Sequence, residues 1–445
     1  MSFLPQAAFL LIMAITGVIL YQRIAFLKKS ILLGKPEARN DRRSERWKTM
    51  WLVAFGQKKM FKRMIPAILH LYIYASFIII NIEVMEFVID GIIGGHRTFA
   101  PYTGWFYGLA MNLFEFLALA VLVACISFLI RRNITKIPRL TSRELKGWPA
   151  LDANLILIIE ILLMCAILTM NATDQILAER GMTYYITIDY LFLSGLIIPL
   201  FEGFSSNTLW IIERSAWWFH IIGILGFAIY ITYSKHLHIF LAFPNTWYTN
   251  LKPKGEMQNM PEVTNEVNLM LGIAPENAPE APPSEIERFG AKDVNDLSWV
   301  SLLNAFSCTE CGRCTAECPA HITGKKLSPR KIMMDTRDRA EEVAKSQDAD
   351  GPGLADGKAL LDDYITKEEI NACTSCNACV EACPVNIDPL SIIMDLKRYV
   401  AMEENSAPAQ WNVMFQNMET SFSPWKFSPS DRFNWADGVK GEEMK

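Results

Sequence analysis

Residues 308–319 read CTECGRCTAECP, and residues 373–384 read CTSCNACVEACP. Both stretches follow the spacing C-x2-C-x2-C-x3-C-P, which is typical of proteins that hold cubane iron-sulfur clusters. A structural zinc site is the alternative, but zinc takes four ligands in a tetrahedron, often from two C-x2-C pairs. Two complete copies of the longer motif, each with a trailing proline, therefore predict two [4Fe-4S] clusters.

The fourth cysteine of each motif is expected to serve the other cluster, because it stands at the start of the following helix and turns away from the first three. The first cluster then has the ligands Cys308, Cys311, Cys314 and Cys383, and the second has Cys373, Cys376, Cys379 and Cys318. All the ligands are protein thiolates, so no iron is left open to substrate. The clusters are predicted to carry electrons.

The rest of the chain has a different composition. The chain has 445 residues, enough for two or three domains, and 51% of them are hydrophobic against 20% charged. Residues 1–250 carry a net charge of +8 and residues 251–445 one of −12, so neither half is basic enough to indicate nucleic-acid binding. Eight of the ten cysteines lie in the two motifs, and without a secretory signal they indicate metal ligands in a reducing compartment.

The first half contains apolar stretches that reach the roughly 20 residues a helix needs to cross a bilayer. Five spans are predicted, at residues 4–27, 64–89, 104–130, 152–177 and 216–241. The first is not a cleaved signal, because its basic residues follow the apolar run and no small-residue cleavage site is evident. The sequence thus predicts an all-α membrane domain with five transmembrane helices.

The charges of the loops predict the orientation. Residues 28–63 carry 12 Lys and Arg, residues 131–149 carry six, and residues 90–103 carry only Arg97. Basic loops stay in the cytoplasm, so the N-terminus is expected outside and the cysteine motifs inside. A sixth apolar run at 184–201 is interpreted as interfacial or re-entrant, because a further span would move the motifs outside.

Four of the six histidines lie in the spans or at their ends. His70 is near the cytoplasmic start of the second span and His238 at the cytoplasmic end of the fifth, so both are expected at one depth. His220 precedes His238 by five helical turns, which predicts one helical face and a separation of about 27 Å; His236 is expected on nearly the opposite face. Such histidines can hold a haem iron, and snorkelling at the interface is the alternative.

Carboxylates also fall inside the spans. Glu83, Glu86 and Asp90 lie near the outer end of the second span, and Glu115 and Glu160 lie within the third and fourth. Buried carboxylates in membranes often relay protons, and a quinone exchanges two protons when it is reduced. For Glu86 and Asp90 the simpler interpretation is a helix end that reaches water.

The membrane half resembles the cytochrome b subunit of respiratory nitrate reductases and its relatives in heterodisulfide-reductase-like complexes. The likeness rests on five spans, an outer N-terminus, one histidine on the second span and the histidine pair on the fifth. It implies a haem b near the cytoplasmic face, with His70 and His238 as ligands. A membrane anchor without haem is the alternative.

The chain departs from that family at the outer haem. Its members carry a second histidine ten residues beyond the first, and this chain has Ile80 there, which cannot ligate iron. His220 keeps the position of the distal ligand. Its partner would be His96, Met85 or nothing.

The sequence around the motifs, CPAHITGKKLSPRKIMMD and NACTSCNACVEACPVNIDPLSIIMDLKRYV, resembles the two-cluster subunits of heterodisulfide-reductase-like and succinate-dehydrogenase-like oxidoreductases. Relatives often continue into a domain with paired CCG motifs, or recruit one as a separate subunit, and this chain has no adjacent cysteines. After Val400 comes a tail whose aromatic residues suggest docking onto a partner: Trp425, Phe427, Phe433 and Trp435.

The expected organisation is a cytochrome b-like membrane domain at 1–245, a proline-rich linker at 246–296, a mostly α-helical ferredoxin-type domain with two clusters at 297–402 and a docking tail at 403–445. We expect a multi-pass subunit of a prokaryotic inner membrane that passes electrons between a menaquinone-type quinone, haem b, the clusters and a soluble partner. That partner would be a CCG-type or electron-transfer-flavoprotein-type subunit. A subunit of a quinol-driven heterodisulfide or sulfur-compound reductase is the alternative.

Overall fold

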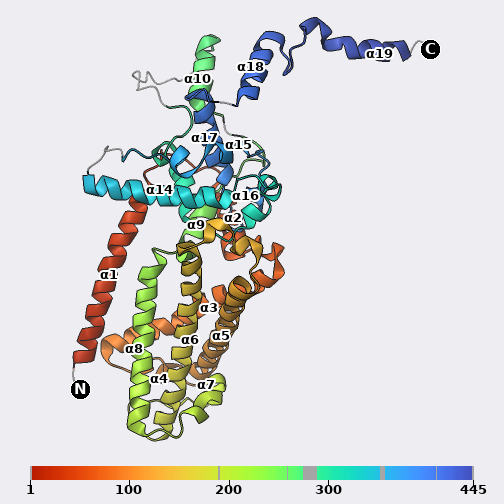
Figure 1. Cartoon of the computed structure of the whole chain (residues 1–445). Helices are drawn as coiled ribbons and strands as arrows, with labels where there is room; N and C mark the ends of the chain where they lie inside the picture. The colour runs from red at the N-terminus through yellow and green to blue at the C-terminus, as the bar shows by residue number, and fades with distance from the viewer. Residues whose placement is uncertain are drawn as a thin grey trace.

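The chain is helical throughout the part that the computed structural model describes, which is residues 3–188, 191–257, 259–273, 288–350, 356–406 and 408–442. No β-strand occurs among these residues. A bundle of long helices occupies the first half, and a layer of shorter helices covers one end of it (Figure 1). We refer to the opposite end of the bundle as the far end.

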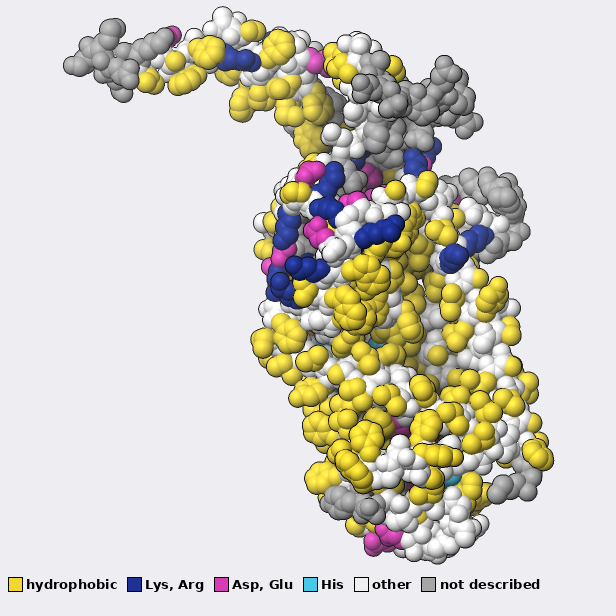
Figure 2. All heavy atoms as spheres, turned by 180° about the vertical axis from the view of Figure 1, so that it is seen from behind, with side chains coloured by type: hydrophobic (Ala, Val, Ile, Leu, Met, Phe, Trp, Pro, Cys, Tyr) yellow, Lys and Arg dark blue, Asp and Glu magenta, His cyan; other side chains and the backbone are white. Residues whose placement is uncertain are grey.

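Five helices are long and apolar enough to cross a membrane, as the sequence predicts. They are α1 (Leu4–Ile31), α3 (Met64–Ile93), α5 (Trp105–Leu129, extended by a π-turn to Ile134), α6 (Trp148–Glu179) and α8 (Ser206–Ile231). Helix α6 packs against α5 and α8, α3 packs against α5, and α1 contacts α3 and α8. The outer surface of this bundle is largely apolar (Figure 2), as a surface in contact with lipid requires.

The fifth span differs from its predicted bounds. Helix α8 ends at Ile231, a 3₁₀ turn follows at Lys235–Leu237, and α9 (His238–Trp247) then begins. The Asp152 carboxylate of α6 stabilises this break, because it accepts hydrogen bonds from Tyr230 Oη (2.6 Å), Ser234 Oγ (2.7 Å) and Lys235 N (3.2 Å). The prediction that His220 and His238 share one helix is therefore wrong.

The described residues of the apolar run at 184–201 contain no span. Residues 189–190 lie outside the described part, and the run continues as the short helix α7 (Phe192–Ile197), which packs on α5 and α6. Figure 1 places α7 at the far end, beside α4 (Ala100–Thr103). The Glu115 carboxylate fixes the start of α7 by accepting hydrogen bonds from Leu193 N (3.0 Å) and Ser194 N (3.2 Å).

The covering layer contains both cysteine motifs. Helix α14 (Pro329–Asp350) lies across the end of the bundle (Figure 1) and packs against α11 (Trp299–Phe306) and α17 (Pro389–Met402). The shorter helices of the covering layer are α12 (Arg313–Ala316), α13 (Pro319–Ile322), α15 (Lys367–Asn371) and α16 (Ala378–Ala382). Membrane-helix residues such as Leu27 and Phe227 belong to the same apolar core as Leu302 and Ile393 of this layer.

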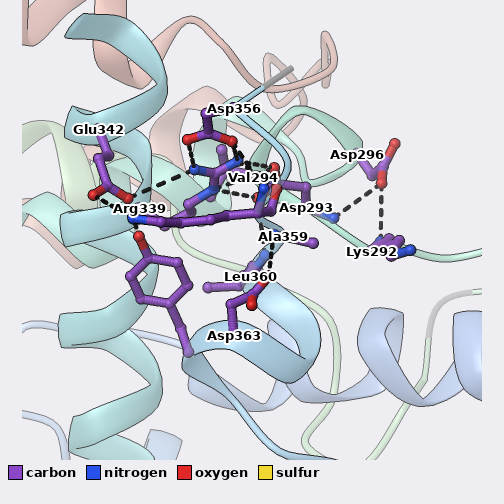
Figure 3. Close-up of polar contacts among 12 residues, drawn as sticks. Lys292, Asp293, Val294, Asp296, Arg339, Glu342, Asp356, Ala359, Leu360 and Asp363 are labelled. Atoms are coloured by element: carbon purple, nitrogen blue, oxygen red, sulfur yellow. Dashed lines mark hydrogen bonds and ion pairs between the residues drawn. The ribbon is translucent and has the colours of Figure 1, made fainter. Parts of the chain in front are cut away.

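The predicted linker at 246–296 is shorter than expected. Its first residues belong to α9, residues 261–270 form α10 (Pro261–Met270), and residues 258 and 274–287 lie outside the described part. Ala291 and Val294 are fully buried in the cluster layer. Figure 3 shows the reason: Arg339 of α14 donates to the Asp293 carboxylate (2.7 Å) and also binds Asp356. Residues 291–296 are thus part of the cluster layer.

The tail is more regular than its sequence suggests. It forms α18 (Ala409–Ser421), a 3₁₀ turn and α19 (Asn434–Glu442), which extend away from the body (Figure 1). Its large apolar side chains are exposed, among them Trp411, Phe415, Phe422, Trp425, Phe427, Phe433 and Trp435.

Candidate electron-transfer centres

The two cysteine motifs fold in the same way. Glu310 (φ 54°) and Ser375 (φ 56°) occupy equivalent positions and are both left-handed, as are Gly312 (φ 70°) and Asn377 (φ 60°). The bend turns a backbone N–H back to the thiol two residues earlier, at 3.4 Å for Glu310 to Cys308 and 3.4 Å for Ser375 to Cys373. Hydrogen bonds to sulfur are a determinant of cluster potential.

Cys318, Cys373, Cys376 and Cys379 line one cavity together with apolar side chains of α13 and α17. These are the four ligands that crossed ligation assigns to the second cluster. A cubane is larger than one ion, so its ligands surround a space. Among the described residues, no three His, Cys, Asp or Glu side chains converge as they would on a single metal ion.

The other four cysteines also lie together. Cys383, from the second motif, is within electrostatic range of Cys308, Cys311 and Cys314 of the first. Burial raises the pKa of the Cys308 thiol to about 12 and that of Cys383 to about 11. Metal ligation keeps such thiols deprotonated, and this donor set fits an iron-sulfur cubane. Both sets therefore match the ligands proposed from the sequence.

Basic residues of the membrane loops surround the first set. Lys59 Nζ donates to the carbonyl of Val380 (3.1 Å) and to Asn386 Oδ1 (3.0 Å), and burial lowers the pKa of this amine. Arg139 donates to the carbonyl of Cys311. In the sequence these residues count only as orientation signals, so their role as contacts to the cluster layer was missed.

His70 and His238 face each other across the boundary between bundle and cluster layer. Their ring centroids are 6.3 Å apart. A metal-bound imidazole nitrogen lies about 2 Å from the metal, so two imidazoles on opposite sides of one iron put their centroids roughly 6 Å apart. The separation would allow both imidazoles to hold one iron, although the two residues come from α3 and from the start of α9.

Hydrogen bonds orient both rings. His70 Nδ1 lies 3.2 Å from Gln57 Oε1, and His238 Nδ1 lies 3.1 Å from the carbonyl of Lys235. Because both partners are acceptors, each Nδ1 carries the proton and each Nε2 has the free lone pair that a metal needs. Burial lowers the pKa of His238, which keeps its ring neutral. These residues therefore fit a haem iron.

Gln57 could not be identified from the sequence. It is buried, has a left-handed backbone (φ 48°) and lies in the turn before α3. A single glutamine in a basic loop carries no signal for such a role, because only the fold brings its amide to His70.

His236 does not lie on the opposite side, as a continuous helix would require. Its ring centroid is 5.4 Å from that of His238 and 5.6 Å from that of Phe227. Burial and the nearby rings of His238 and His70 lower its pKa to about 3. The break after α8 brings His236 into the same cluster of imidazoles.

His220 occupies a separate place deep in the bundle. Its Nδ1 lies 3.0 Å from the carbonyl of Leu163, its Nε2 has no partner among the described residues, and its ring meets Phe87 at 5.7 Å. His96 is engaged elsewhere, with Asp174 at 3.1 Å, and Met85 is 59% exposed on the outside of the bundle. The structure pairs neither of them with His220.

Glu86 and Asp90 do not reach water, contrary to the simpler interpretation of the sequence. Both are buried. Glu86 accepts hydrogen bonds from Phe99 N (2.7 Å) and Tyr107 Oη (2.6 Å), and Asp90 accepts one from Arg97 N (2.8 Å). The loop between α3 and α5 folds back over the helix end and supplies the two backbone donors, and α5 supplies Tyr107.

Residues 307–387 match the 4Fe-4S dicluster domain family. The chain is similar to the probable iron-sulfur-binding oxidoreductase FadF of Bacillus subtilis, with 28% identity over 95% of this chain and 59% of that protein. It is equally similar to the EtfAB:quinone oxidoreductase of Syntrophomonas wolfei, with 28% identity over 93% of this chain and 57% of that protein. The chain therefore spans less than three-fifths of the length of these curated relatives.

A shorter similarity, with 24% identity, involves one of the subunits of the dihydromethanophenazine:CoB–CoM heterodisulfide reductase of Methanosarcina mazei. It covers 32% of this chain and 35% of that protein. No solved structure matches the chain. The protein is thus similar to iron-sulfur oxidoreductases, carries a 4Fe-4S dicluster domain and has five helices suited to a membrane.

Proposed function

We propose that the protein is a membrane-bound electron-transfer subunit with two [4Fe-4S] clusters and a haem b held by His70 and His238. One observation carries the haem: the two imidazoles stand 6.3 Å apart with both Nδ1 atoms hydrogen-bonded to acceptors. When bound, the haem and clusters supply one-electron redox chemistry, and the protein supplies spacing, orientation and electrostatics.

The positions of two cationic side chains, Arg313 and Lys59, suggest the order in which electrons pass through the redox centres. The Arg313 guanidinium is within electrostatic range of both His70 and Cys311. Lys59 likewise connects the histidine pair with the first cluster. It follows Gln57, the hydrogen-bond partner of His70, by two residues, and its amine lies close to Cys383. The first cluster would therefore stand between the histidine pair and the second cluster. The second cluster, whose ligand Cys376 is exposed, would face the soluble partner.

The comparisons support a proposal for the redox partners. EtfAB:quinone oxidoreductase is named for an electron-transfer flavoprotein and a quinone, and we propose the same two classes here, a menaquinone-type quinone and a flavoprotein or CCG-type subunit. The exposed aromatic side chains of α18, α19 and the turn between them offer a docking surface for that subunit. A heterodisulfide or sulfur-compound reductase partner is the second candidate, favoured by the similarity to the heterodisulfide reductase of Methanosarcina mazei.

We further propose that the protein lies in a prokaryotic inner membrane, with the cluster layer in the cytoplasm and the start of α1 outside. The basic loops support this orientation. The start of α1 points away from the cluster layer (Figure 1).

A reduced-minus-oxidised visible spectrum of the purified protein tests the haem. The wild-type protein is expected to show a b-type haem spectrum, and His70→Ala and His238→Ala are each expected to abolish it while the electron paramagnetic resonance of the clusters persists. His321→Ala is the matched control, because this histidine is exposed on α13. A full haem spectrum in His70→Ala would overturn His70 as a haem ligand, and a wild-type protein without a haem spectrum would leave the haem-free anchor as the function of the membrane half.

A further inference from the structure

The far half of the bundle contains more carboxylates than cations. Two guanidinium groups, those of Arg97 and Arg214, face them, and the imidazole of His96 lies beside Asp174. The buried carboxylates in this region are those of Glu83, Glu86, Asp90, Glu115, Asp174 and Glu213. Charges are costly within a bilayer, so this region is expected to hold protons as well as ion pairs.

Five of these six carboxylates have hydrogen-bond donors. Backbone N–H groups donate hydrogen bonds to Glu86, Asp90 and Glu115, and side chains donate hydrogen bonds to Asp174 and Glu213. The donors are Phe99 N, Arg97 N, Leu193 N and Ser194 N from the backbone, and Arg97, Tyr185 and Arg214 from side chains.

Glu83 is the exception among the described residues. Its side chain is 3% exposed, and both carboxyl oxygens are buried without a hydrogen-bond partner. A carboxyl group in such a place is stable only in its protonated, neutral form, because an unpaired buried charge is far more costly than a neutral acid. The neutral acid is itself destabilising without a partner. A packed apolar residue would stabilise the bundle better, so stability does not explain this residue.

The surroundings connect Glu83 to a polar chain. It lines a narrow crevice between α3, α5 and α6, together with Glu115, Asn171 and apolar side chains. Asn171 donates to Glu115 (3.3 Å) and accepts from Arg97 (3.1 Å), and Arg97 donates to Asp174 (2.6 Å). His96 follows at 3.1 Å from Asp174. This chain leads from the crevice to the loop at the far end.

We propose that Glu83 is a proton-transfer residue for quinone chemistry at the far half of the bundle, an inference that rests on the proposed function. Reduction of one quinone consumes two electrons and two protons. After each electron arrives, the O–H bond of the Glu83 acid breaks, its proton passes to a quinone oxygen where a new O–H bond forms, and the carboxylate regains a proton from water at the far end of the bundle, along the polar route that Asn171, Arg97, Asp174 and His96 line. Quinol oxidation runs the same steps in reverse.

Glu83→Gln tests this assignment, because the amide has the same shape and cannot exchange a proton in this way. In the full-length protein, reduced with dithionite, freed of excess dithionite and then mixed with a water-soluble naphthoquinone, quinone reduction is expected to slow about a hundredfold. The visible spectrum and the cluster resonances should not change. Redox-difference infrared spectra should lose the band of a protonated carboxylic acid. Glu83→Asp, which keeps the acid, should retain that band and part of the rate.

Glu160→Gln is the matched control, since Glu160 is a carboxyl of α6 beside Cys125 and outside this network. It should keep both the rate and the band. Wild-type rates in Glu83→Gln, or an unchanged infrared band, would overturn the role of Glu83 while leaving the proposed function intact. A wild-type protein that fails to reduce the naphthoquinone would overturn both.

Discussion

Equivalent residues of the two cysteine motifs share a backbone and differ in what their side chains bind. Glu310 of the first motif is buried and pairs with Lys235 and with Arg337 (3.0 Å), so it ties that motif to the turn between α8 and α9. Ser375, in the same position of the second motif, places its hydroxyl 3.4 Å from the sulfur of Met394 in α17. One motif is therefore specialised for contact with the bundle.

The hydrogen bond between His70 and Gln57 can be tested by replacing Gln57. In the proposed haem site, Gln57→Leu removes the acceptor of His70 Nδ1–H, would make the imidazole a weaker donor to iron and should raise the haem midpoint potential. Gln57→Glu supplies an anionic acceptor and should lower it. The measurement is a spectroscopic redox titration. Lys58→Arg, an exposed neighbour in the same turn, should leave the potential unchanged. Shifts of one sign in both Gln57 variants would contradict this role.

Cys318→Ser tests the crossed ligation. Although Cys318 belongs to the first motif, it lines the cavity of Cys373, Cys376 and Cys379. The variant should therefore lose or alter the second cluster and leave the first, as electron paramagnetic resonance during a redox titration would show. Cys165→Ser, a change in the membrane half, is the control. Selective loss of the first cluster would refute the assignment.

At the scale of elements, the break between α8 and α9 decides where the histidines lie. A straight helix would keep His236 and His238 far apart around its axis. The 3₁₀ turn brings both beside His70, and Arg23 of α1 covers the end of α8 by donating to the carbonyl of Thr232 (3.3 Å). Polar residues from α1 and α6 thus shape a site formed by other elements.

The break depends on Asp152, which is 2% exposed and has three donors, one from the end of α8 and two from the residues that follow it. Asp152→Ala leaves those donors unpaired and should destabilise the protein by about 2 kcal/mol. It should also lower the haem content measured by the pyridine haemochrome assay. Asp152→Asn keeps one acceptor oxygen and should lose less of both. A normal haem content in Asp152→Ala would mean that the turn is held by other contacts.

At the scale of the whole molecule, an ion pair and backbone hydrogen bonds join the cluster layer to the bundle that it covers. Arg330 of α14 is fully buried and donates to Glu144 (2.6 Å) and to the carbonyl of Arg139 (2.6 Å), both in the loop between α5 and α6. The segment after α1 adds a backbone pairing, with Lys35 N to the carbonyl of Leu297 (2.7 Å). Gly34 is required there, because a Cβ would lie 2.6 Å from the backbone of Ser298.

Glu144 makes this contact dependent on pH. Burial alone would raise the pKa of its carboxyl, but the hydrogen bond and charge of Arg330 hold the pKa at about 2, below the ordinary value of 4.5. A lowered pKa in the folded state stabilises above pH 4.5, and the stabilisation is lost as the pH falls towards 2. Unfolding temperatures in detergent should therefore fall over this range. Glu144→Gln should remove part of that dependence and cost about 2 kcal/mol at pH 7.

The proposed orientation predicts which end of the bundle a reagent outside the cell can reach. Single cysteines at Arg42 and Thr98, introduced in whole cells, should differ in labelling by an impermeant maleimide, with position 98 labelled and position 42 protected. A cysteine at Met182 should behave like that at 98. Labelling at 42 with protection at 98 would invert the proposed orientation.

The cysteine spacing and the length of the apolar runs determine much of this protein directly from sequence. Three thiolates within seven residues, as in Cys308–Cys314, hold a cluster through local geometry, and an apolar run of membrane length must become a helix because lipid offers its backbone no hydrogen bonds. The five spans and the dicluster domain followed from these local constraints.

The tertiary structure alone decides the rest, because it depends on groups distant in sequence. Hydropathy cannot locate the break after Ile231, since Asp152 creates it from about 80 residues away. Helical periodicity could not place His236, and no pattern marks Gln57 as the partner of His70. The missing partner of Glu83 is likewise visible only when α3, α5 and α6 pack together, because whether a buried carboxyl is satisfied depends on every neighbour that surrounds it.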